Sequence, residues 1–176
     1  MRKTILTFGL LSGAVSALMM SVTMAFSDRI GIDRGYVVGY TTIVLSCLFI
    51  YFGVRSYRDN VSGGTITFAR AFGVGIAIGV ISCLCYVVAW EIIYFNFMPD
   101  FLDKYNAYAI AKLKASGASA AVVQHQIEAN DHMKVLYANP LFNAALTFIE
   151  PFPVALLVTL ISAGVLRKKP GLKVAA

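Results

Sequence analysis

Residues 71–95 read AFGVGIAIGVISCLCYVVAWEIIYF, an apolar stretch whose only charged side chain is Glu91. A helix needs about 20 mainly apolar residues to cross the hydrocarbon core of a bilayer. This stretch meets that length with one charge. It therefore predicts a helix that spans a membrane.

Three further stretches, residues 4–26, 36–54 and 141–166, have the same apolar character. Of the 176 residues, 59% are hydrophobic and 14% are charged, whereas soluble domains carry about 25% charged residues. The sequence therefore predicts an all-α integral membrane protein, with one membrane domain over residues 1–176 and four transmembrane helices at about 4–26, 36–54, 71–95 and 141–166. Little of the chain remains for a separate soluble catalytic domain.

Basic residues flank the predicted spans unevenly. One set precedes the first span, follows the second and follows the fourth: Arg2, Lys3, Arg55, Arg58, Arg70, Arg167, Lys168, Lys169 and Lys173. In the other two connections the charges cancel. The positive-inside rule places the basic set in the cytoplasm, and an even number of crossings also puts both termini on one side. We therefore predict a multi-pass protein of the inner (cell) membrane with both termini cytoplasmic.

The net charge of +6 comes from these flanks. No basic patch with interleaved aromatic residues lies on a soluble face, as nucleic-acid binding would require. We expect no nucleic-acid partner. The expected partners are the lipid bilayer and either a second copy of the chain or another membrane protein.

The segment from about residue 99 to residue 139 is too polar to span the membrane. Pro99 suits the first turn of a helix, Ser116-Gly117 interrupts the helical pattern, and Ser119 suits the N-cap of a second helix. Between these points, apolar residues recur at spacings of three and four, which indicates amphipathic helices. The segment predicts an extramembrane helical hairpin between the third and fourth spans.

Small residues recur at every fourth position in the first and third spans, notably Gly9, Gly13, Gly75 and Gly79. Residues four apart share one face of a helix, and small residues allow helix backbones to approach closely in lipid. We favour packing within one chain, with a homo-oligomer interface as the alternative.

Two carboxyl groups fall inside predicted spans, Glu91 in the third and Glu150 in the fourth. Charged groups within a bilayer are costly and are candidates for function. Both lie in the outer half of the bilayer, where they form a candidate intramembrane polar site that a shared proton or a bound cation would stabilise. Pro151 and Pro153 follow Glu150 and predict a helix kink, because proline removes backbone donors. A structural role for both acids is the interpretation that we favour over transport.

His125, Glu128 and His132 share a helical face in the hairpin segment. They form a weak metal candidate, because the two histidines lack the i, i+4 spacing of zinc helices. A solvated polar face is the favoured interpretation of these three residues.

Residues 62–65 read SGGT without the lysine of a Walker nucleotide-binding loop, and no other catalytic motif is in a water-accessible context. We predict no catalytic residues, no metal and no cofactor.

Several segments resemble a bacterial membrane family known as domain of unknown function 4199. They are GGTITFARAFGVG at 63–75, YVVAWE at 86–91, PDF at 99–101, NPLF at 139–142 and LISA at 160–163. The resemblance covers nearly the whole chain and implies a four-span bacterial inner-membrane protein. It implies no activity, substrate or site residue.

These observations favour a small membrane protein without catalysis of its own, which acts through helix packing with lipid or protein partners. The first alternative is a proton- or cation-conducting or transport-accessory protein that uses Glu91 and Glu150. The second is a metal-dependent membrane enzyme.

Overall fold

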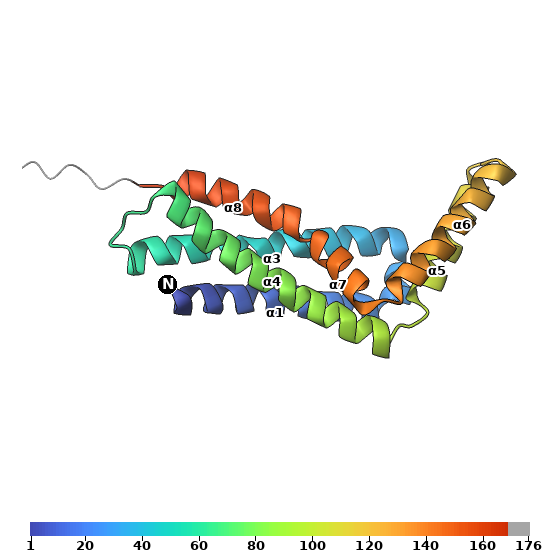
Figure 1. The fold of residues 1–176 in the computed structure, drawn as a ribbon, viewed down its shortest axis with the longest axis horizontal. Coiled ribbons are helices and arrows are strands. Elements are labelled where there is room, and N and C mark those ends of the chain that lie inside the picture. The colour runs from blue at the N-terminus through green and yellow to red at the C-terminus, as the bar shows by residue number, and fades with distance from the viewer. Residues whose placement is uncertain (169–176) are drawn as a thin grey trace, which may run out of the picture.

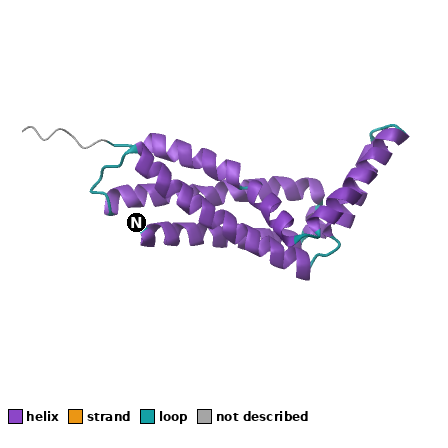
Figure 2. Ribbon diagram, in the orientation of Figure 1, coloured by secondary structure: helices purple, strands orange, loops and turns teal. Residues whose placement is uncertain are grey.

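The computed structural model of the protein describes residues 1–168 and is built from helices (Figures 1 and 2). The helices are α1 (Arg2–Ala25), α2 (Ser27–Ile30), α3 (Ile32–Asn60), α4 (Phe68–Asn96), α5 (Phe101–Ala115), α6 (Ala120–Tyr137), α7 (Pro140–Ile149) and α8 (Phe152–Leu166). Across residues 1–168 there is no strand, only one isolated bridge between Ile66 and Lys168. The all-α prediction is confirmed.

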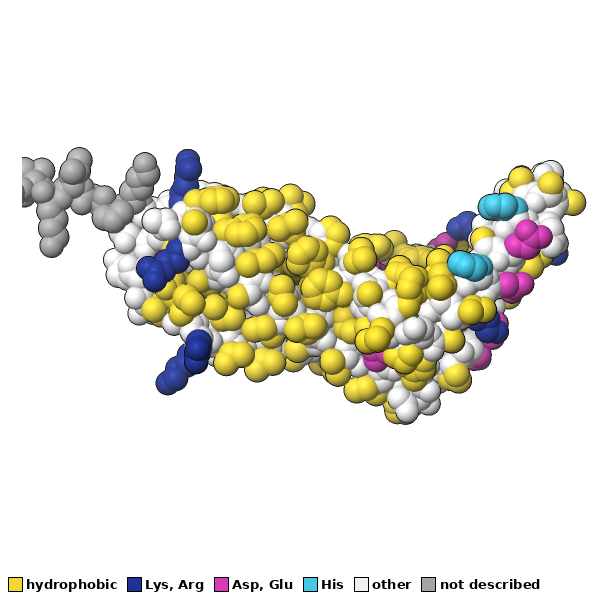
Figure 3. Space-filling model, viewed as in Figure 1, with side chains coloured by type: hydrophobic (Ala, Val, Ile, Leu, Met, Phe, Trp, Pro, Cys, Tyr) yellow, Lys and Arg dark blue, Asp and Glu magenta, His cyan; other side chains and the backbone are white. Residues whose placement is uncertain are grey.

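Four helical segments are long and apolar enough to cross a membrane: Arg2–Ala25, Ile32–Asn60, Phe68–Asn96 and Pro140–Leu166. The prediction of four transmembrane helices is therefore confirmed. On the face that Figure 3 shows, hydrophobic side chains cover most of the bundle, and Lys and Arg side chains gather at the end that holds the N-terminus. This distribution suits an apolar solvent around the middle of the bundle.

The helix α4 lies at the centre of the bundle and contacts α1, α3, α7 and α8. Glycines on α1 allow the first of these contacts. A Cβ added at Gly9 would lie 2.8 Å from Cγ2 of Ile81, and one added at Gly13 would lie 2.5 Å from Cβ of Cys85. The two backbones are therefore too close for any side chain at these positions.

Glycines on α4 allow the contact with α8 in the same way. A Cβ at Gly75 would lie 2.8 Å from Cγ2 of Thr159, and one at Gly79 would lie 3.2 Å from Cβ of Ala155. Lipid tails are as apolar as leucine, so helices in a bilayer associate mainly through such close packing and through polar contacts. The glycines singled out by their spacing face other helices of the same chain.

Three buried serines form the main polar contact among α1, α3 and α4. The Ser12 hydroxyl donates to the backbone carbonyl of Ser46 at 2.7 Å, and the Ser12 and Ser82 hydroxyl oxygens are 2.8 Å apart. Ser12 has a single hydroxyl proton, so Ser82 is the donor in the second bond. The cluster links three of the four spans at one depth.

The fourth span is divided at Glu150 and Pro151 into α7 and α8. Pro151 has no N–H to donate to the carbonyl of Thr147 four residues earlier, so the helical ladder is interrupted. At the other end of α7, the Asn139 side-chain oxygen accepts from the Leu141 N–H at 2.9 Å, and Pro140 occupies the first turn, a favourable position for proline.

The helices α5 and α6 lie side by side and project at an angle from the bundle (Figure 1). The Lys134 ammonium and the Asp103 carboxylate pair across them at 2.5 Å. Gly117 turns the chain between them with φ of +78°, a conformation that favours glycine. The position of this pair outside the membrane stays a prediction.

The connection between α3 and α4 is held against the end of α8. The Ile66 N–H donates to the Lys168 carbonyl at 3.0 Å, and the Lys168 N–H donates back to the Ile66 carbonyl at 2.9 Å. This pairing brings Arg167 and Lys168 to the same end as the α3–α4 connection. The basic residues Lys169 and Lys173 lie outside the described residues.

Replacing Gly13 by alanine is expected to destabilise the bundle by about 1–3 kcal/mol, because overpacking forces a well-packed interface apart. Gly164→Ala is the matched control, since nothing lies within 4 Å of a Cβ at Gly164 and alanine is favoured over glycine in a helix by about 0.5–1 kcal/mol. Unfolding of the purified protein in mixed micelles by sodium dodecyl sulfate measures both. Equal stability of the two variants would contradict the described α1–α4 contact.

Candidate functional site

A cavity of about 540 Å³ lies within the half of the bundle next to α5 and α6. Residues of α1, α3, α4 and α7 form its walls, and residues of α5 and α6 complete the lining. Apolar side chains dominate the lining. Its polar groups include five tyrosines and one carboxyl group: Tyr36, Tyr40, Tyr86, Tyr105, Tyr137 and Glu150.

Glu150 reaches the cavity because the helix breaks beside it. It lies between the end of α7 and Pro151, and one carboxylate oxygen accepts from the Tyr86 hydroxyl at 3.2 Å. Glu150 is surrounded by protein yet keeps exposed surface, as expected for a side chain that lines a cavity. Tyr36, Tyr86 and Tyr137 line the cavity together with this carboxyl group.

A buried amide fixes α7 against α4 beside the cavity. The side-chain oxygen of Asn143, which is 0% exposed, accepts from the Trp90 indole N–H at 2.9 Å and from the Thr147 hydroxyl at 3.2 Å. The Asn143 side-chain nitrogen donates to the Tyr137 carbonyl at 3.5 Å. Trp90 and Thr147 both line the cavity, so this network holds two of its walls together.

Glycines leave the α3 wall of the cavity open. Gly35 and Gly39 are one helical turn apart and both line the cavity. A Cβ added at either position would meet nothing within 4 Å. These glycines therefore border empty space, unlike the glycines of α1 and α4 that pack against other helices.

Glu91 lies in different surroundings from Glu150. It follows Trp90 on α4, where successive residues point about 100° apart around the helix axis, and it does not line the cavity. Its Oε1 atom is buried, and no hydrogen bond reaches it from any described residue. No hydrogen bond or ion pair joins the two carboxyl groups, so a shared proton or cation stays a hypothesis.

His125, Glu128 and His132 are exposed along α6. Glu128 accepts from the Gln124 amide at 3.1 Å. Over residues 1–168, no group of three or more His, Cys, Asp and Glu side chains is arranged to hold a metal ion. The structure does not bring the three candidate ligands together.

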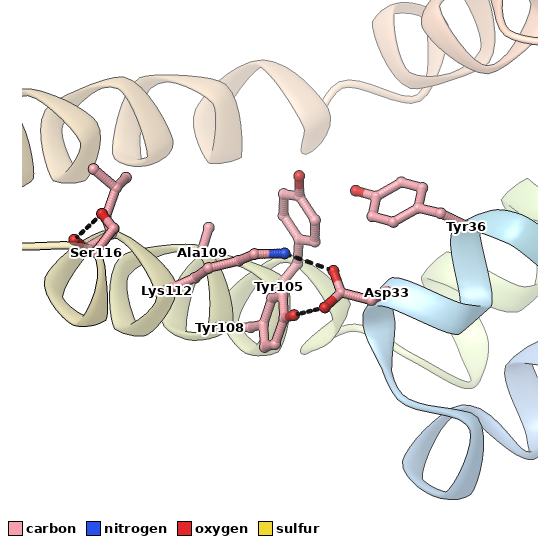
Figure 4. A pocket seen from close by; sticks show the side chains of 8 residues that line it. Asp33, Tyr36, Tyr105, Tyr108, Ala109, Lys112 and Ser116 are labelled. Atoms are coloured by element: carbon pink, nitrogen blue, oxygen red, sulfur yellow. Dashed lines mark hydrogen bonds and ion pairs between the residues drawn. The ribbon is translucent and has the colours of Figure 1, made fainter.

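A second, smaller cavity of about 310 Å³ lies between the start of α3 and α5 (Figure 4). There the Asp33 carboxylate accepts from the Lys112 ammonium at 2.8 Å and from the Tyr108 hydroxyl. The hydrogen bond and the charge of Asp33 raise the pKa of Lys112 above its usual value. We call this contact the Asp33 latch, because it joins α5 to a transmembrane helix.

Tyr36 and Tyr105 line both cavities. Their rings meet edge to face with centroids 6.3 Å apart. The Asp33 latch therefore adjoins the wall of the larger cavity, and α5 supplies part of that wall.

Sequence reasoning identified Glu150 but missed Asn143 and the tyrosines. Asn143 had a usable signal, because an amide inside an otherwise apolar span needs a hydrogen-bond partner on another helix. Tyr36 and Tyr40 also share a helical face at i and i+4. Nothing in their spacing indicates that Tyr86, Tyr105 and Tyr137 join them.

The substitution Asp33→Asn is expected to release α5 from α3, with faster amide hydrogen exchange over residues 101–115 and little change in the bundle. The pair is exposed, and such ion pairs add little to global stability. Because the pKa of Lys112 is raised and the pKa of Asp33 is lowered, the ion pair is complete between the ordinary aspartate pKa of about 3.9 and the ordinary lysine pKa of about 10.4, and is lost only beyond these limits. Exchange measured near pH 7 therefore reports the intact latch.

The matched control is Asp100→Asn, which removes a carboxylate that pairs with Lys104 at 2.9 Å within the same segment. Unchanged exchange in Asp33→Asn, or equal acceleration in both variants, would contradict the role of the latch.

No curated protein and no solved structure matches this chain. One family model does match, over residues 7–168, and its description is "Protein of unknown function (DUF4199)". The match covers nearly all of the chain, as the resemblance in its sequence predicted. The chain therefore belongs to the DUF4199 family.

Proposed function

We propose that this protein is a non-catalytic, multi-pass protein of a bacterial inner membrane that binds a lipid-like amphiphile in the cavity beside α5 and α6. The observation that carries the proposal is the cavity of about 540 Å³, a size typical of small-molecule sites. Its lining joins apolar side chains with tyrosine hydroxyls, which matches a molecule with an apolar body and a polar end.

The charge distribution supports an orientation with both termini in the cytoplasm. The backbone pairing of Ile66 with Lys168 groups the basic residues of the α3–α4 connection with those that follow α8. Basic flanks remain on the cytoplasmic side of a membrane. The cavity then lies in the outer half of the bilayer, with α5 and α6 on the outer side.

The lining also supports binding rather than catalysis. It contains one carboxyl group, no histidine and no cysteine. The Glu150 carboxyl group and the Tyr86 hydroxyl lie within 3.2 Å of each other, but no further hydrogen bond from a described residue orients this pair, as nucleophilic catalysis requires.

Trp90 makes the proposal directly testable, because it is the single tryptophan of the chain and lines the cavity. A nonionic alkyl glycoside brominated near the end of its chain is expected to quench Trp90 fluorescence saturably in nanodiscs. Gly39→Phe is expected to abolish the saturable component, because the added ring fills space that is open at Gly39.

Gly164→Phe is the matched control, since it adds the same ring on α8, at a position where no atom lies within 4 Å of a Cβ. It is expected to bind the probe as the wild type does. Linear, unsaturable quenching in the wild type, or equal saturable quenching in both variants, would contradict an amphiphile site in this cavity.

A topology measurement checks the orientation. Single cysteines placed at residue 2 and residue 168 of a cysteine-free chain are expected to resist an impermeant maleimide in intact cells. A cysteine at Gly117, in the α5–α6 turn, is expected to react. Labelling of only one terminus would show that the number of crossings is odd.

A further inference from the structure

The larger cavity contains one carboxyl group, and no described cation forms an ion pair with it. Glu150 accepts a hydrogen bond from Tyr86, and no ion pair involves it. Lys104 also lines the cavity, but its ammonium pairs with Asp100 at 2.9 Å. A carboxylate among apolar groups is costly unless an opposite charge accompanies it.

The groups around this carboxylate are aromatic. Glu150 accepts a hydrogen bond from Tyr86, and the same cavity is lined by Tyr36, Tyr40, Tyr105, Tyr137 and Trp90. The faces of aromatic rings attract cations, and cages of such rings recognise quaternary ammonium groups. A carboxylate beside several rings combines charge pairing with this attraction.

The same lining disfavours a bare metal cation. Calcium and magnesium take about six or more oxygen ligands at short distances, whereas this cavity offers one carboxylate and a mainly apolar wall. Its volume of about 540 Å³ far exceeds the space that a desolvated inorganic ion fills. An organic cation with apolar substituents fits both the charge and the volume.

We propose that the cavity selects an amphiphile with an organic ammonium head, which Glu150 pairs and the tyrosine rings surround. This inference rests on the proposed function, since it names the chemistry of the molecule bound in the same cavity. The apolar walls formed by α1 and α5 then hold the apolar part of the ligand.

The test compares two probes that differ in one atom. Hexyltrimethylammonium carries the cation, and its uncharged analogue has carbon in place of nitrogen. Trp90 fluorescence of the full-length protein in nanodiscs reports binding of each. The wild type is expected to bind the cation at least about tenfold more tightly than the uncharged analogue, because the Glu150 carboxylate and the tyrosine rings attract a positive charge but not an uncharged group.

Glu150→Gln is expected to remove this preference, so that the two probes bind within about threefold of each other, while the affinity for the uncharged analogue stays unchanged. That unchanged affinity shows that the variant is folded.

Tyr36→Leu removes one ring without altering charge and is expected to weaken cation binding by about two- to fivefold. Glu91→Gln is the matched control, a carboxyl-to-amide change within a span but outside the cavity lining, and it is expected to change neither affinity.

The outcomes separate the two proposals. Equal binding of both probes by the wild type would leave the amphiphile site in place and overturn the cationic preference. The absence of a fluorescence response to either probe would overturn both. Loss of preference in Glu91→Gln as large as in Glu150→Gln would overturn the assignment of the charge to Glu150.

Discussion

The close packing of α4 against α1 and α8 is the constraint on which the rest of the structure depends. In lipid, apolar side chains gain little by turning inward, so the helices are held by close approach and by hydrogen bonds. Gly9 and Gly13 allow α1 to reach α4, and Gly75 and Gly79 allow α8 to reach it. The Ser12 hydroxyl, between Ser46 and Ser82, fixes the depth at which three spans meet. With α4 so placed, the half of α4 that is nearer α5 and α6 turns Tyr86 and Trp90 toward the cavity.

The break at Pro151 gives the fourth span two roles. The part nearer the basic end, α8, packs tightly on α4 through Ala155 and Thr159, whereas the part nearer α5 and α6, α7, is held by the Asn143 network with Trp90. Between them lies Glu150, at a point where the helical ladder is interrupted. A continuous helix would extend the α8 packing outward and would leave no separate wall for the cavity.

The parts of the fold that depend on local pattern were predictable. Apolar runs of sufficient length marked the spans, and Ser116-Gly117 and Ser119 marked the boundary between α5 and α6. Rotation about the helix axis was not predictable, because it depends on which face packs inward. Trp90 faces the cavity, and Glu91, its immediate neighbour, does not. The tyrosines come from segments far apart in the chain, and only tertiary packing brings them together.

The paired backbone of Ile66 and Lys168 ties the α3–α4 connection to the last turn of α8, so three helix ends are fastened at the basic end of the bundle. At the opposite end, α5 is fastened to α3 by exposed groups, Asp33 with Tyr108 and Lys112. Backbone hydrogen bonds therefore hold the basic end of the bundle, whereas an exposed carboxylate contact, of a kind that adds little to stability, holds α5 to α3 at the other end. Separation of α5 from α3 would remove the part of the larger cavity's wall that α5 supplies, while the basic end stays paired.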